Sequence, residues 1–220
     1  MNGTGVHRAG LVAAALVTGL LASAAPARAD ALAGVASVGS ADFTRNGEAV
    51  TVETLAPCDV DGATTNTSVP VAVGGLAFGA GASSCTRTVV DEVNSVTTTH
   101  SEATGEKFEL SALVPAGGPR LKVGTWKIVC DATQTGTNAG WQVSGVTGFA
   151  GLPEQVPTNH LHEVTRPDGT VLARVIFSEV VLPEPNDGSI AMNLMRFEFT
   201  PASGLTGGLV VGSTECAPTP

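Results

Sequence analysis

A pair of histidines, His160-Leu161-His162, is the pattern in this sequence that comes nearest to a metal site. Residues two apart on a strand project from the same face, so the two imidazoles could share one ion. A zinc site needs at least one more ligand, but the adjacent Glu163 would point away and His100 is the only other histidine after residue 29. We therefore predict no metal site and expect two exposed histidines beside a loop.

The segment Asp59-Val60-Asp61-Gly62 matches the opening of a calcium-binding loop, in which alternate carboxylates reach one cation and glycine makes the bend. Such a loop ends on a bidentate glutamate at its twelfth position, and here that position is Pro70. Aspartate and glycine are also common turn residues. We therefore predict a turn, and no cofactor.

Signals for catalysis are few. The sequence contains no Gly-x-Ser-x-Gly motif, and the four cysteines are expected to form disulfides. Glu102, Glu106 and Glu109 could supply a carboxylate pair for glycoside cleavage, but glutamates on a solvated strand edge are the more common arrangement. These observations favour a protein that is not an enzyme.

Aromatic residues give little support for sugar binding, because tyrosine is absent and only two tryptophans occur. Trp126 falls in a row of inward-facing residues and is predicted to lie in the core. Trp141 follows a glycine-containing stretch and could be either a contact residue or a core anchor.

The first 29 residues have the three-part order of a secretory signal peptide. His7 and Arg8 precede an apolar run from Leu11 to Ala22, and Ala27-Arg28-Ala29 offers small residues before a cleavage site. The run is shorter than the roughly 20 apolar residues that span a bilayer. We predict a signal peptide over 1–29, a single secreted domain over 30–220, and no integral membrane segment after cleavage.

Removal of the leader leaves 9 basic against 20 acidic residues, a net charge of −11. A surface with this much negative charge repels phosphate backbones and anionic lipids. Nucleic acid is therefore excluded as a partner. All four cysteines, Cys58, Cys85, Cys130 and Cys216, lie in the exported part, which predicts two disulfides with three possible pairings. Cys58 with Cys85 and Cys130 with Cys216 is favoured, because the second bridge would tie in the C-terminal strand.

Period-two alternation of apolar and polar residues recurs along residues 35–216, and no window shows a helical stripe. Turn signals separate the short strands, among them Asn46-Gly47, Asn138 to Gly140 and Arg166-Pro167-Asp168-Gly169. Gly124 is predicted to form a β-bulge, after which Trp126 faces the same side as Leu121 and Val123. About ten such strands predict an all-β fold, an antiparallel β-sandwich, with a barrel as the alternative.

The closing segment Gly207 to Cys216, with Cys130-Asp131-Ala132-Thr133 and Asn193-Leu194-Met195, resembles the choice-of-anchor P family of exported actinobacterial proteins. The resemblance implies a secreted or surface β-rich protein and brings no activity with it.

These observations favour a non-enzymatic exported protein that binds an extracellular or cell-envelope ligand through its surface. Two alternatives stay open. One is a secreted hydrolase with a site built from scattered carboxylates and His160 or His162. The other is a secreted protease inhibitor whose reactive loop would lie between Cys58 and Cys85.

Overall fold

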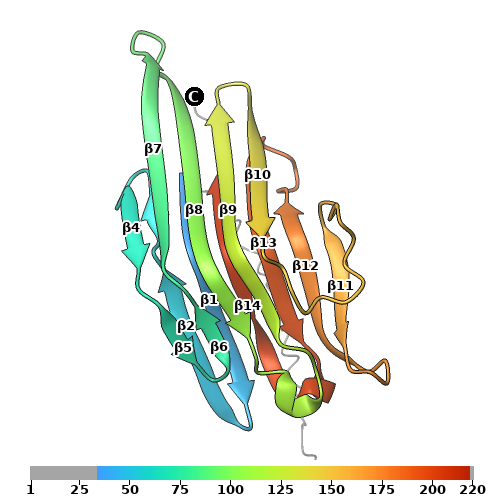
Figure 1. The fold of residues 1–220 in the computed structure, drawn as a ribbon. Coiled ribbons are helices and arrows are strands. Elements are labelled where there is room, and N and C mark those ends of the chain that lie inside the picture. Colours follow the sequence, from blue (N-terminus) through green and yellow to red (C-terminus); the bar gives the residue numbers. More distant parts are fainter. Residues whose placement is uncertain (1–33, 219–220) are drawn as a thin grey trace, which may run out of the picture. The chain divides into compact units, whose positions relative to one another are not determined.

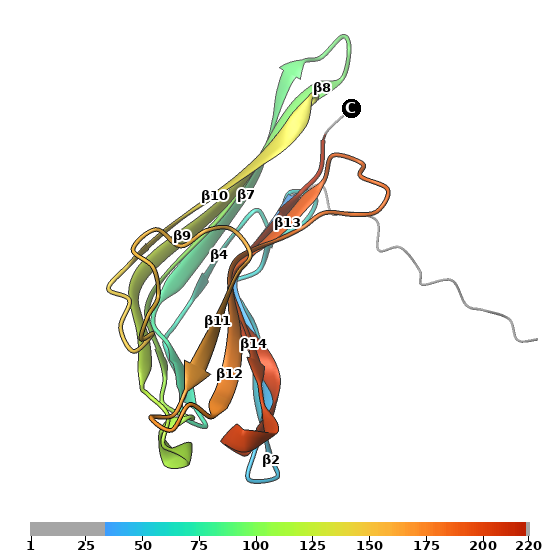
Figure 2. The same cartoon turned by 90° about the vertical axis from the view of Figure 1, so that its right-hand side faces the viewer.

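Two antiparallel β-sheets pack face to face in the computed structural model, which describes residues 34–218 (Figures 1 and 2). Neither sheet closes into a barrel, so the predicted sandwich is confirmed. The predicted leader lies outside the described residues. Over the described range, no helix is long and apolar enough to span a membrane.

Sheet A contains the first and last strands of the described chain, which lie side by side. Its strands in spatial order are β11 (His160–Thr165), β12 (Val171–Val181), β13 (Ile190–Phe199), β14 (Leu205–Cys216), β1 (Gly34–Arg45) and β2 (Glu48–Leu55), with β3 (Cys58–Asp59) also paired to β1.

Sheet B is built around the longest strand. Its spatial order is β10 (Gly136–Ser144), β9 (Leu121–Thr133), β8 (Val96–Leu110), β6 (Leu76–Phe78) and β5 (Val71–Val73). The first part of β8 pairs instead with β7 (Gly81–Asp91), to which β4 (Thr65–Ser68) is added. Two single-turn 3-10 helices, η1 (Val114–Ala116) and η2 (Pro201–Ser203), follow β8 and β13.

Two of the predicted turns are confirmed and one is wrong. Asn46 and Gly47 both have positive φ, as a two-residue hairpin turn between β1 and β2 requires, and Gly169 has a φ of 87° in the turn before β12. Asn138 to Gly140 instead run through the middle of β10, because all three pair with β9. Non-local strand pairing here overrides the local preference of asparagine and glycine for turns.

Both disulfides join the two sheets, with the favoured pairing. Cys58 of β3 in sheet A bonds to Cys85 of β7 in sheet B, and Cys130 of β9 in sheet B bonds to Cys216 of β14 in sheet A. Ser101 of β8 pairs with both Cys85 and Cys130, so it lies between the two crosslinks in sheet B. The bridges therefore hold one layer against the other.

In several strands, the alternating residues that face the interior switch between odd and even positions halfway along the strand. In β9, Leu121 and Val123 are buried before Gly124, and Trp126 is buried after it, as predicted. The predicted bulge is absent, because the pairing of β9 with β8 keeps one register across Gly124. In sheet A the corresponding change brings two consecutive residues, Leu194 and Met195, into the interior together.

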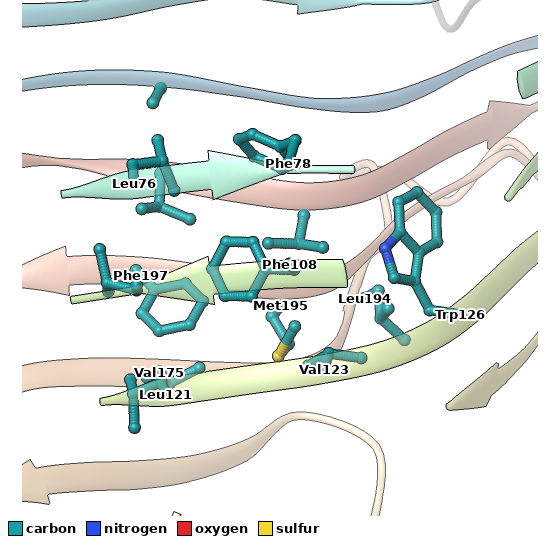
Figure 3. Packing of buried hydrophobic residues seen from close by; sticks show 14 of the residues in the cluster. Leu76, Phe78, Phe108, Leu121, Val123, Trp126, Val175, Leu194, Met195 and Phe197 are labelled. Carbon is teal, nitrogen blue, oxygen red and sulfur yellow. The ribbon is translucent and has the colours of Figure 1, made fainter. Parts of the chain in front are cut away.

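Aromatic rings fill the space between the sheets at this level (Figure 3). The ring centroid of Phe108 lies 5.4 Å from that of Phe78 and 5.8 Å from that of Phe197, which comes from the opposite sheet. Period-two alternation predicts an inward row of Phe108, Leu110, Ala112 and Val114, and the first three are buried. Val114 is exposed, because the chain leaves the strand after Leu110 and turns into η1.

Candidate functional site: an apolar pocket at the open side of the sandwich

The two histidines of β11 project from one face, but the expectation that both are exposed is wrong. His162 is only 8% exposed, and its ring lies 5.8 Å from Phe149 and 6.2 Å from Phe177, centroid to centroid. Burial lowers the pKa of His162, and the nearby His160, 6.4 Å away between ring centroids, lowers it further. The His162 imidazole is therefore a neutral part of an apolar wall.

A third ligand does not join the histidines. Glu163 points to the opposite face, where its carboxylate lies 3.5 Å from Nε of Arg174. Across residues 34–218, no three His, Cys, Asp or Glu side chains gather in a way that could hold a metal ion.

The aspartates after Cys58 form a turn. Asp59 Oδ1 accepts a hydrogen bond from the backbone N–H of Asp61 at 2.8 Å, while the Asp61 carboxylate accepts one from Arg87 at 2.5 Å. That bond lowers the pKa of Asp61. The Asp61 carboxylate is directed at an arginine and not at a shared cation position with Asp59.

The three glutamates lie on β8, which is a central strand and not the predicted edge. Glu102 lies 2.6 Å from Lys127, and Glu109 is paired with Arg120 and, at 3.2 Å, with Lys122. The pKa of Glu109 is lowered, chiefly because Arg120 and Lys122 donate hydrogen bonds to it. A carboxyl group held ionised in this way is a poor general acid at neutral pH.

The structure does bring apolar side chains together around a pocket of about 380 Å³ that the sequence analysis did not predict. It lies between the sheets on the side bounded by β10. Its lining residues share an apolar or aromatic character, with a few polar groups: Trp141, Val143, Ser144, Gly145, Val146, Phe149, Leu152, Pro153, Glu154, Val156, Phe177, Ser178, Leu194 and Met195.

Each wall of the pocket has a local cause. In sheet B, Trp141 pairs with Ile128 and Val143 with Trp126, so both side chains share the inward face of their buried partners. In sheet A, the change of phase places Leu194 and Met195 side by side, opposite Phe177 and Ser178. Ser178 has a φ of 49°, and this left-handed residue accompanies the change of phase in β12.

The third wall is the loop between β10 and β11, residues 145–159. It carries apolar residues at 146, 149, 152 and 156, and all four line the pocket. Phe149 is the buried one; its ring lies 5.2 Å from Phe177 and 6.4 Å from Phe197 between centroids. Loops of this length without their own secondary structure are uncommon in compact domains and are often functional. The apolar spacing in this loop is the sequence signal that could have revealed the site.

Two features mark the mouth of the pocket. Val143 is 37% exposed although it lies on the inward face of its strand. Glu154 is exposed, and over residues 34–218 its carboxylate has no ion-pair partner. Trp141 is half-buried, so it acts as both core anchor and pocket lining. The pocket therefore suits an apolar group of a ligand, which burial would hold in place, and the protein's Glu154 carboxylate lies near the entrance.

The fold and this pocket define a disulfide-linked antiparallel β-sandwich with an apolar cavity at its open side. Comparison with protein-family models, curated proteins and solved structures found no match. The resemblance to choice-of-anchor P proteins stays a prediction from the motifs alone.

Proposed function

We propose that the protein is a non-enzymatic binding module that works outside the cytoplasm and takes an apolar group into the pocket beside β10. The pocket carries this proposal: its volume of about 380 Å³ falls in the range of small-ligand sites, and such sites are mostly apolar with few polar groups. Burial of a ligand's apolar surface there would supply the affinity.

Export is supported by two independent features. Residues 1–29 have the order of a cleavable signal peptide, and the two disulfides are typical of oxidising compartments. Expression of the full chain in an exporting host should yield extracellular protein that begins at Asp30 and contains no free thiol. Retention of Met1 or the presence of reactive thiols would contradict export.

The groups named for a hydrolase lie apart. The two histidines belong to β11 of sheet A, whereas the three glutamates belong to β8 of sheet B and are paired with lysine or arginine. The segment between Cys58 and Cys85, named for an inhibitor, forms β4, β5, β6 and the start of β7, so much of it is paired in sheet B. The pocket is the arrangement that supports a function best.

A neutral apolar dye whose fluorescence rises on burial, such as N-phenyl-1-naphthylamine, tests the pocket directly. We expect saturable binding to the oxidised protein. Val143→Glu places a charge at the mouth and should weaken dye binding by tenfold or more, since burying an unpaired charge is unfavourable. Gln142→Glu is the matched control, because it adds the same charge to the neighbouring, outward-facing position and should leave dye binding unchanged. Equal effects of the two substitutions, or no saturable binding, would overturn the proposal.

A further inference from the structure

The strand β10 ends sheet B and has no charged residue, proline or bulge. Over residues 34–218, its backbone pairs only with β9, so its other edge presents unpaired N–H and C=O groups. Proteins commonly guard such edges with charged residues, proline or a bulge, or keep the strand short. β10 has nine residues, Gly-Thr-Asn-Ala-Gly-Trp-Gln-Val-Ser, with no charge and no proline, and its pairing with β9 is unbroken.

The other edge strands of the described chain are guarded. β11 has six residues and carries the charged Glu163, and β2 carries Glu48 and Glu53. β4 and β5 have only four and three residues, and the part of β7 beyond β4, residues 85–91, carries Arg87 and Asp91. The open edge of β10 is therefore a specific feature, and it coincides with the pocket, which Trp141 and Val143 of the same strand line.

A strand added along this edge would lie about 4.8 Å from β10 and would direct alternate side chains toward the pocket side. In this mode of recognition, main-chain hydrogen bonds supply affinity and pockets select the side chains. The exposed mouth at Val143 is where an inward-pointing side chain of such a strand would enter.

Charge indicates the partner's composition. The chain has a formal net charge of −9, and Glu154 at the pocket offers a carboxylate with no cation paired to it among the described residues. A lysine or arginine beside the buried side chain would match it, whereas a second copy of this acidic chain would be repelled.

We infer that the ligand is an extended, basic and apolar polypeptide segment of another protein. It pairs with β10 as an additional strand, places an apolar side chain in the pocket and brings a cation to Glu154. This inference rests on the proposed function, because it names the ligand of the same pocket.

A pool of heptapeptides tests it, with lysine at odd positions and valine, leucine, isoleucine or phenylalanine at even positions. We expect the pool to displace the neutral dye and to slow amide hydrogen exchange across β10. The same pool with N-methyl groups on alternate residues, prepared in both registers, keeps every side chain. One of these two N-methylated pools should bind at least tenfold more weakly than the parent pool, because its N-methyl groups remove several main-chain hydrogen bonds to β10.

The substitution Glu154→Gln should weaken binding of the pool several-fold and reduce its salt dependence. Glu163→Gln, on the outward face of sheet A, is the matched control and should change neither. A pool with glutamate in place of lysine should not bind.

Three outcomes would overturn the inference. In the first, the dye binds but no peptide pool displaces it, which leaves the proposed function standing. In the second, both N-methylated pools bind as tightly as the parent, so β10 is not used. In the third, sedimentation shows a dimer that slows amide exchange in β10, so a second copy covers the edge. If neither dye nor peptide binds, the proposed function fails as well.

Discussion

The indole of Trp126 lies against Gly212 of the opposite sheet so closely that a Cβ added to Gly212 would come within 2.8 Å of Trp126 Cζ3. On its other side, a Cβ on Gly105 would come within 2.4 Å of Trp126 Cζ2. Two glycines thus make room for Trp126, which is the buried one of the two tryptophans. Figure 3 shows its indole beside Leu194. Gly212 also has a φ of 62°, a value that residues other than glycine rarely adopt.

Substitution Gly212→Ala should therefore destabilise the protein strongly. We expect a loss of about 2 to 4 kcal/mol, since a methyl group at this position adds both overpacking and backbone strain. Urea unfolding of the oxidised protein measures the change. Gly136→Ala is the control, because nothing lies within 4 Å of its added Cβ, and it should stay within about 0.5 kcal/mol of the parent. Equal losses for the two variants would contradict this account.

Removal of either disulfide should loosen the packing of one sheet on the other. In the chain-entropy model, the bridges at sequence separations of 27 and 86 residues contribute about 3.5 and about 4.6 kcal/mol. We expect the double variant C130A/C216A to be the less stable of the two, as measured by urea midpoint. A larger loss for C58A/C85A would show that local packing outweighs loop length.

Acidification should destabilise the protein through His162. Because burial lowers the folded-state pKa of this histidine below its usual value near 6.5, the unfolded chain takes up the proton first. Stability is then unaffected above about pH 7.5 and falls as the pH drops through 6.5 toward the folded-state pKa. The carboxyl groups whose pKa is lowered titrate below about pH 4.5, outside this window.

Thermal unfolding between pH 8 and pH 5 measures this effect. The substitution His162→Leu should reduce the fall in melting temperature between pH 8 and pH 5, with each protein compared to its own value at pH 8. The reason is that the buried group that resists protonation is gone. An unchanged slope would show that His162 is not the responsible residue.

Two arginine–glutamate pairs on the outer face of sheet A should differ in strength. Glu179 is buried and accepts hydrogen bonds from Arg196 and Asn193, whereas Glu163 and Arg174 are both about half exposed and 3.5 Å apart. Burial acts to raise the pKa of Glu179, but the hydrogen bonds from Arg196 and Asn193 outweigh it and lower that pKa.

The substitution Glu179→Ala should cost about 1.5 to 3 kcal/mol, the range for hydrogen bonds to charged groups. Glu163→Ala should cost less than about 1 kcal/mol, because exposed pairs are weak and screened by salt. Urea unfolding at low and moderate ionic strength measures both changes. If the Glu163 substitution proves as costly, burial is not what distinguishes the pairs.

Local pattern determined the strands, the hairpin at Asn46-Gly47 and the phase change at Gly124, because alternation and turn propensity act between near neighbours in the chain. The even count of cysteines predicted two bridges, and the expectation that Cys216 ties in the C-terminal strand favoured the pairing that forms. The sequence by itself did not show that both bridges cross between the sheets, since that depends on which strands pair.

Only the tertiary structure decided the burial of His162 and the position of Asn138 to Gly140 within β10. His162 is buried because Phe149, from a loop without regular structure, folds against it, and the apolar spacing of that loop does not show which strand it will pack against. The pocket arises in the same way: Trp141 and the loop that directly follows β10 meet Phe177 of β12 and Leu194 of β13, and only the packing of the two sheets brings these three segments together.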